Sequence, residues 1–335
     1  MNKRIATLTL VVSLLVSLLA AVSAFAAGFE GAWTASASEK KAGYIQLNMT
    51  HRPNSMNGNT MAISKLAGLT AAQVASAATA PVRFSTQNEA GTIAFDGTFR
   101  NGNGAGQFVF TSNPTYLESM RALGVDVSPE RERRGRKQDE QELLYQYVVH
   151  DVSTAYVKSM IAEGYRVPLH KYLELRIFDV TPEYIREMRD LGFRNITNEE
   201  VVASRIHRVT PDYVRRMRAA GWNLTLDELQ STSIHGATPE FAEEMKKAGY
   251  PDLDIDIDEL VSFRIHRVTP EFIRDLRQLG YDRIDADDLV SMSIHRVTPE
   301  YIRELKDAGY SKVPVENLIS MRIHNVDAEL LRKMK

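Results

Sequence analysis

A segment of about 29 residues recurs along the last two thirds of this 335-residue chain, and it constrains the fold more than any other feature. Its clearest copy is residues 265–281. Each copy starts at a residue whose side-chain oxygen can cap a helix. The starting residues are Asn113, Ser153, Thr181, Thr210, Thr238, Thr269, Thr298 and Asp327. Their regular spacing predicts a repeated unit that begins with a helix.

Glycine follows each starting residue by eleven positions in all seven complete copies. Only glycine readily adopts the left-handed conformation that ends many helices, so these glycines predict where each first helix stops. They are Gly124, Gly164, Gly192, Gly221, Gly249, Gly280 and Gly309. The predicted helix is about ten residues long, with Phe272, Ile273 and Leu276 on the inner face of the clearest copy.

A second, shorter helix is predicted in each copy. Thr197 and Thr225 are each followed three residues later by Glu, as in a capping box, and Asp256 and Asp285 are similar starts. The apolar positions of this helix include Leu260, Val261, Phe263 and Ile265. Neither helix can bury its apolar stripe alone, so neighbouring copies must stack. We predict an α-solenoid-like array over 112–335, with about seven repeats, a partial last one and a charged loop inserted at 129–141.

Residues 27–111 have a different pattern. Apolar residues alternate with polar ones around Ile45, Leu47 and Met49, and again near Phe95 and Phe108, which is typical of half-buried strands. The sequence at 101–104 predicts a hairpin turn. The expected fold class is therefore α+β: a small antiparallel β domain of five or six strands, followed by the helical array.

Residues 1–26 resemble a secretory signal. Lys3 and Arg4 precede an apolar run, and Ala24-Phe25-Ala26 fits a cleavage site. An uncleaved membrane anchor is the alternative, because the run approaches the length needed to span a bilayer. Cleavage would remove two positive charges from a formal net charge of −2, leaving −4. We expect a periplasmic or secreted protein with no stable membrane span after cleavage. The chain has no cysteine, which excludes disulfides and thiol chemistry.

Histidine recurs three residues before most starting residues. The repeated histidines include His150, His207, His235, His266, His295 and His324. Equivalent positions on stacked helices lie about 8–10 Å apart. Zinc ligands must lie about 2 Å from one ion, so neighbouring copies cannot share a metal. Phe110 and Phe178 occupy the same sequence position, which favours a structural role in packing over metal binding or proton switching.

Basic residues recur at the fifth and eighth positions after the starting residue. The candidate partner-binding set is Arg186, Arg189, Arg215, Arg218, Arg274, Arg277, Arg303 and Lys306. Two interpretations stay open. These side chains can stabilise the helices through the dipole and through ion pairs three residues apart. Alternatively, they form a basic stripe that grips an acidic partner.

No catalytic, cofactor-binding or metal-binding set is recognisable. The sequence lacks His-Glu-x-x-His, Gly-x-Ser-x-Gly and a phosphate-binding loop. The tract at 102–106 lacks the Lys-Ser/Thr ending of such a loop. We therefore expect no cofactor and no enzyme activity. Export and a negative net charge argue against a nucleic-acid partner.

The repeat Ile-His-x-Val-Thr-Pro-Glu-Tyr/Phe-Ile-Arg, behind the segments 90–99 and 104–110, resembles an exported repeat family of bacteria. It is similar to the extracytoplasmic segments of some antirepressor-type sensor metallopeptidases. The resemblance lends no catalytic residue, because the peptidase zinc motif has no counterpart here. It implies sensing or scaffolding in the cell envelope. We expect a non-enzymatic interaction protein that binds an envelope protein. Alternatives are a binder of an anionic envelope polymer and, third, an uncharacterised hydrolase.

Overall fold

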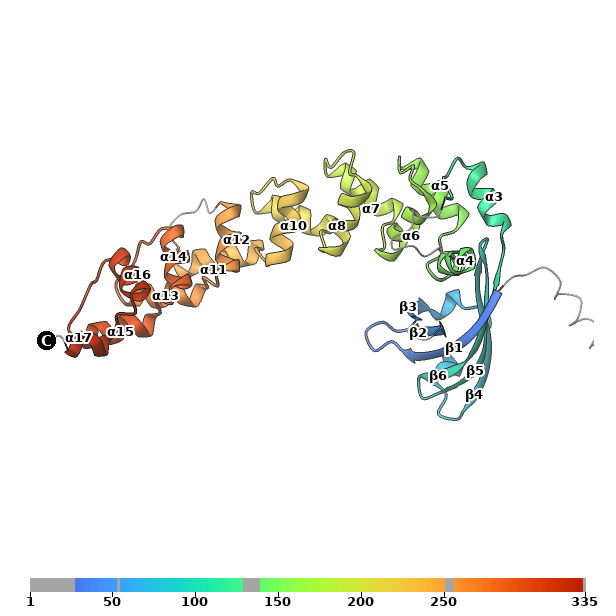
Figure 1. Cartoon of the computed structure of the whole chain (residues 1–335), viewed down its shortest axis with the longest axis horizontal. Coiled ribbons are helices and arrows are strands. Elements are labelled where there is room, and N and C mark those ends of the chain that lie inside the picture. The colour runs from blue at the N-terminus through green and yellow to red at the C-terminus, as the bar shows by residue number, and fades with distance from the viewer. Residues whose placement is uncertain (1–27, 53–54, 129–138, 251–255, 334–335) are drawn as a thin grey trace, which may run out of the picture. The chain divides into compact units, whose positions relative to one another are not determined.

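The computed structural model describes residues 28–52, 55–128, 139–250 and 256–333 (Figure 1). A six-stranded antiparallel sheet is followed by an array of helices, which confirms the predicted α+β fold class. The chain divides into two compact units between Pro182 and Glu183. The first unit holds the sheet and the first helices of the array, and the second unit holds the remaining repeats. The predicted signal segment lies outside the described residues.

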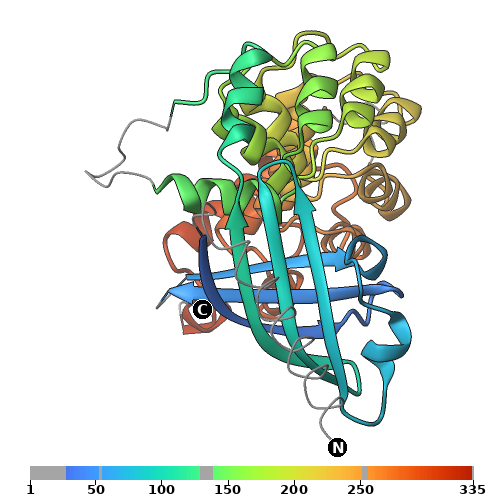
Figure 2. The same ribbon diagram turned by 90° about the vertical axis from the view of Figure 1, so that its right-hand side faces the viewer.

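The sheet is built from hairpins whose strands all run antiparallel to their neighbours (Figure 2). Its strand order is β3-β2-β1-β6-β5-β4. The strands are β1 (Gly28–Ala37), β2 (Tyr44–Arg52), β3 (Ser55–Ala62), β4 (Ala80–Asn88), β5 (Gly91–Arg100) and β6 (Asn103–Ser112). Asn101 and Gly102 join β5 to β6 with positive φ angles of 48° and 79°, which confirms the predicted hairpin turn.

The alternating residues form the core of the sheet, as predicted. Ile45, Leu47 and Phe108 are at most 1% exposed. Trp33 crosses the middle of the same face and its indole N–H donates to the carbonyl oxygen of Asp96 at 3.2 Å. A Cβ on Gly97 would lie 2.7 Å from the Trp33 ring, so glycine is required where the indole lies.

Helix α4 (Glu140–Val149) packs on the sheet and joins it to the first repeat. Its Tyr145 is buried against Phe108, with ring centroids 6.0 Å apart. Nε2 of His51 lies 2.7 Å from a carboxylate oxygen of Glu142, so this buried histidine links β2 to α4. Glu140 and Gln141 belong to this helix, which means that the predicted loop at 129–141 ends earlier. Residues 129–138 lie outside the described residues.

Each complete repeat contains an A helix and a B helix of similar length, so the expectation of a shorter second helix was wrong. Two short elements, η1 (Ile63–Lys65) and α2 (Ala71–Ala75), precede the array. The A helices are α3 (Thr115–Ala122), α5 (Thr154–Ala162), α7 (Pro182–Asp190), α9 (Pro211–Ala219), α11 (Pro239–Ala248), α13 (Pro270–Gln278), α15 (Pro299–Asp307) and α17 (Ala328–Lys333). After α4, the B helices are α6 (Leu169–Ile177), α8 (Asn198–Ile206), α10 (Leu226–His235), α12 (Ile257–Ile265), α14 (Ala286–Ile294) and α16 (Val315–Ile323).

Within the second unit, A helices pack against A helices and B helices against B helices. Contacts join α11 to α13 and α13 to α15, and they join α8, α10, α12, α14 and α16 in sequence. The starting threonines cap the A helices as predicted; for example, the hydroxyl of Thr269 accepts from the backbone N–H of Phe272 at 3.2 Å. Ile273 and Leu276 are buried in the clearest copy, and Phe272 is half-buried.

The predicted glycines end the A helices. All seven have positive φ angles, between 76° and 97°. The N–H after the glycine bonds back across the last turn, as Tyr281 does to the carbonyl of Leu276 at 3.0 Å. This is the Schellman ending that the sequence predicted.

The B helices also end in this way, but without a required glycine. Val268 donates to the carbonyl of Phe263 at 2.9 Å, and Val297 donates to that of Met292 at 2.8 Å. The left-handed residue of each B ending is Asp151, Asp179, Arg208, Gly236, Arg267, Arg296 or Asn325, with φ between 53° and 70°. Side chains other than glycine tolerate φ only up to about 70°. The A endings lie beyond that limit, which explains why only they always use glycine.

Tyrosine hydroxyls join successive repeats. The hydroxyl of Tyr184 donates to the carbonyl of Val209 at 2.8 Å, and the hydroxyl of Tyr301 donates to that of Val326 at 2.7 Å. In the first unit, Tyr156 makes the same bond to Val180 at 2.9 Å. Each bond satisfies a carbonyl at the start of the next repeat.

Candidate functional site

One isoleucine on each B helix of the second unit is exposed. These five residues form what we call the isoleucine ridge: Ile206, Ile234, Ile265, Ile294 and Ile323, which are 49–54% exposed. Each is the last or next-to-last residue of its helix. Ile265 is one of the apolar positions predicted for its helix, but it does not belong to the buried stripe. Single exposed apolar residues are ordinary, but five at one repeat position on stacked helices form an apolar row.

The core position beside the ridge varies far more than the ridge itself. Two residues before each ridge isoleucine lies Ser204, Thr232, Phe263, Met292 or Met321. The first four are at most 1% exposed. Packing therefore tolerates a change from serine to phenylalanine inside the array, while the exposed position is isoleucine in all five of these repeats. The buried neighbour therefore does not account for the repeated isoleucine, which makes the ridge a candidate contact surface.

Arginine flanks the ridge in three repeats. Arg208, Arg267 and Arg296, here called the C′ arginines, follow a ridge isoleucine by two positions and are exposed. Within the described residues, their side chains form no hydrogen bond or ion pair. Their φ angles of 58–59° place non-glycine residues in the left-handed region, at a cost of order 1 kcal/mol each.

Helix electrostatics does not explain the C′ arginines. A cation is favoured at a helix C-terminus, whereas an anion is disfavoured there. Yet Asp151 and Asp179 occupy the same position in the first unit. In another repeat Gly236 occupies this position at φ 70°. Glycine adopts this conformation without strain, so the backbone does not require an arginine here. Neither helix electrostatics nor the backbone conformation therefore determines the side chain at this position, which leaves it available for binding a partner.

The predicted basic residues at the fifth helix position have partners inside the array. Arg186 pairs with Glu183 at 2.6 Å, and Arg274 pairs with Glu271 at 2.7 Å. Arg303 pairs with Glu300 at 3.0 Å, and Arg215 reaches Glu187 of the preceding repeat at 2.9 Å. These contacts favour the stabilising interpretation of this set. The pKa of the Glu271 carboxyl is lowered by a backbone hydrogen bond and by the charge of Arg274.

Two residues at the eighth position donate hydrogen bonds to the end of the preceding A helix. Arg218 donates to the carbonyl of Leu191 at 2.5 Å, and Arg277 donates to that of Ala248 at 3.4 Å. Both acceptors belong to the end of the preceding A helix, where carbonyls lack helical partners. Arg189 and Lys306 lie exposed in the last turns of α7 and α15. Six of the eight predicted residues are thus engaged inside the array: three pair within their own helix and three contact the preceding repeat.

The repeated histidines lie at the ends of the B helices. His207, His266 and His295 are half-buried, while His235 and His324 are exposed. Backbone carbonyls at these positions accept bonds from the next repeat: Ser293 donates to His266 at 2.5 Å. Phe178 ends α6 in the same way. Phe110, however, lies in the core of β6, so the proposed equivalence with the histidines was wrong.

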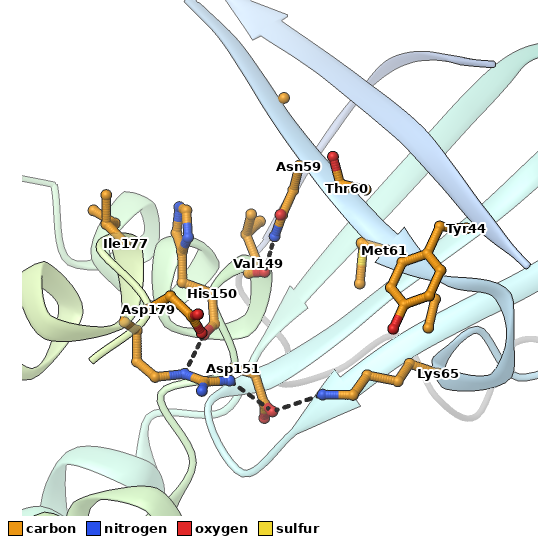
Figure 3. A pocket seen from close by; sticks show the side chains of 13 residues that line it. Tyr44, Asn59, Thr60, Met61, Lys65, Val149, His150, Asp151, Ile177 and Asp179 are labelled. Carbon is orange, nitrogen blue, oxygen red and sulfur yellow. Dashed lines mark hydrogen bonds and ion pairs between the residues drawn. The ribbon is translucent and has the colours of Figure 1, made fainter. Parts of the chain in front are cut away.

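The first unit contains a separate pocket of about 510 Å³ beside β3 (Figure 3). Asp151 lies at its centre, 3.7 Å from Lys65 and 3.1 Å from Arg176. Arg176 also donates to the carbonyl of His150 at 2.9 Å. Burial, together with the charge of Arg176, lowers the pKa of His150. The charged groups of this pocket largely neutralise one another, so it offers little net charge to a ligand.

Across the described ranges, no three His, Asp or Glu side chains lie where they can hold one metal ion. In the same part of the chain, no helix combines the length and apolarity needed to cross a bilayer. The isoleucine ridge with its C′ arginines is therefore the best candidate site, and its chemistry is that of a binding surface.

Comparison with known proteins returned no match to this chain among family models, curated proteins or solved structures.

Proposed function

We propose that this protein is an exported, non-enzymatic interaction protein whose helical repeats bind a protein partner in the cell envelope, in a scaffolding or sensing role. The observation that carries the proposal is the isoleucine ridge, where one exposed apolar residue recurs while the buried position beside it varies. Export remains a proposal from residues 1–26. The sequence resemblance to segments of sensor metallopeptidases also remains a prediction.

The apolar ridge favours a protein over an anionic polymer. Protein interfaces bury apolar side chains at their centre and place charge at the rim. A polyanion binds chiefly through cations and gains little from five exposed isoleucines. The basic residues expected to grip a polymer are paired with glutamates or close helix ends. The ridge therefore supports a protein partner over the polymer, with the C′ arginines as the charged rim of the binding surface.

Capture from an envelope fraction tests the proposal. The full protein, produced by secretion and immobilised, should retain a protein that the variant Ile265→Ser/Ile294→Ser loses. Val109→Ser is the matched control, because Val109 is 50% exposed but lies on the sheet. Protease treatment of the fraction should abolish capture. Capture that survives protease but not polymer digestion would establish the polymer alternative, and equal capture by the ridge variant would exclude the ridge.

A further inference from the structure

The ridge also indicates what kind of protein segment it binds, an inference that rests on the proposed function. We propose that the isoleucine ridge binds an acidic protein segment in an extended conformation, with an apolar side chain at every third residue. Three observations lead to this chemistry: the even recurrence of the ridge on stacked helices, the unpaired C′ arginines beside it, and the length of the ridge.

The spacing of the ridge favours an extended chain. The B helices α8, α10, α12, α14 and α16 pack in sequence, and packed helices lie about 8–10 Å apart. Three residues of a polyproline II chain advance about 9.3 Å and return to the same face. Seven residues of an α-helix advance about 10.5 Å, so a helical partner drifts out of register over several repeats. A β-strand places residues three apart on opposite faces.

The charge of the ridge specifies an acidic segment. Arg208, Arg267 and Arg296 are exposed and, among the described residues, have no carboxylate beside them as a partner. His207, His266 and His295 lie between them and the ridge in sequence, and imidazole N–H groups can also donate to carboxylates. With apolar side chains on the ridge, the two intervening residues of each triplet face the arginines or solvent. Acidic residues there would pair with arginines that have no partner in the described part of the chain.

The ridge sets the length of the segment. Its five isoleucines require about thirteen residues of an extended chain, which spans roughly 37 Å. Several weak contacts on one segment act together, because later contacts form within the same complex. Binding should therefore depend on the number of triplets as well as on their composition.

Synthetic peptides test this inference. The probe is a fluorescent peptide of six Leu-Glu-Glu triplets, titrated with the full protein and followed by anisotropy. Three control peptides replace Leu with Ser, replace Glu with Lys, or keep the composition but place the leucines together. We expect binding of the probe alone, weakened by at least about tenfold in Ile265→Ser/Ile294→Ser and in Arg267→Gln/Arg296→Gln. The matched variant Arg274→Gln/Arg303→Gln should bind normally, because those arginines are already paired.

Any other pattern of peptide binding contradicts the proposed extended acidic segment. Equal binding of the Lys peptide would exclude charge recognition, and equal binding of the clustered-leucine peptide would exclude the matched spacing. A probe that gains helical circular dichroism on binding would replace the extended segment with a helix. Failure of every peptide overturns this inference only, provided that the ridge variants still lose the envelope partner. Capture that is unaffected by those variants overturns the proposed function instead.

Discussion

At the scale of single residues, backbone conformation separates the two helix endings of each repeat. The A endings lie at φ between 76° and 97° and always use glycine. The B endings lie at φ between 53° and 70° and accept Asp, Arg, Asn or Gly. The sequence predicted the first set because one residue type recurs. It could not predict the second, because residues of four types share that conformation and none of them marks a helix end by itself.

Gly280→Ala should lower the free energy of unfolding by about 1 kcal/mol or more. Gly280 has φ 93°, and an added Cβ would meet no atom within 4 Å. Any loss is therefore a cost of the backbone conformation and not of a clash. Urea unfolding followed by circular dichroism measures the change. The comparison variant is Arg267→Gly at φ 59°, where relief of strain and the added flexibility of glycine roughly cancel. Equal destabilisation by the two variants would contradict this account of the endings.

The ridge itself shows a limit of prediction from periodicity. Ile265 lies two residues after the buried Phe263, at the last turn of α12. A helical pattern assigns a face only to within a residue or so at a helix end, where few neighbours constrain it. The available signal was the recurrence of isoleucine beside a core position that changes from serine to phenylalanine. The apolar character of Ile265 alone does not distinguish an exposed position from a buried one.

At the scale of elements, the capping boxes predicted from sequence are present in α8 and α10. Thr197 accepts from the N–H of Glu200 at 3.2 Å, and Glu200 accepts from the N–H of Thr197 at 2.7 Å. The same pair of bonds joins Thr225 and Glu228. Starts that lack this pattern were harder to predict: α6 and α16 follow Pro168 and Pro314, which provide no side-chain cap.

Because of these capping boxes, we expect the free energy of unfolding to decrease as the pH is lowered. Hydrogen bonds from Thr197 and Thr225 lower the pKa of Glu200 and Glu228 below the ordinary 4.5. A carboxyl whose pKa is lowered by folding stabilises the protein above its unfolded pKa, and this contribution is lost as the pH falls through the folded pKa. Glu200→Gln/Glu228→Gln should therefore melt at a lower temperature than the parent at pH 7. The difference should shrink towards pH 3, and a difference that is constant with pH would contradict the assignment.

The tyrosine bonds between repeats give a second prediction at this scale. Tyr184→Phe removes the hydroxyl that donates to the carbonyl of the buried Val209, leaving that carbonyl without the bond. An unsatisfied buried acceptor costs about 1–3 kcal/mol, which urea unfolding would detect. The control is Tyr44→Phe, because Tyr44 is half-buried and its hydroxyl makes no hydrogen bond within the described residues. A loss in Tyr184→Phe no larger than that in Tyr44→Phe would contradict the bond's role.

At the scale of the whole molecule, the sequence predicted both parts of the chain but not how α4 joins them. Alternation identified the strands, and the repeat identified the array. The link was missed because it depends on contacts between distant residues: Tyr145 against Phe108, and Glu142 with His51. His51 shows no motif in sequence, and its role follows only from the fold. Periodic patterns report local structure, whereas such pairings need the tertiary arrangement.

The second unit should fold without the first. In repeat arrays each copy contacts mainly its neighbours, so stability is close to a sum over adjacent copies. A fragment comprising residues 179–335 keeps α7 intact and should give a helical circular dichroism spectrum with a cooperative urea transition. The same fragment ending at 250 tests the array's length, and it should be less stable because the A–A contacts α11–α13, α13–α15 and α15–α17 are lost. An unfolded 179–335 fragment would show that its stability depends on the first unit.

The most direct test of the central claim is site-specific photo-crosslinking in the secreting host. A photoreactive amino acid replaces Ile294 on the ridge, or Arg303 on α15, whose guanidinium is paired with Glu300. The account predicts a discrete protein adduct from position 294 that is absent from position 303. Adducts from position 303 and none from position 294 would place the binding surface on the A helices and contradict it.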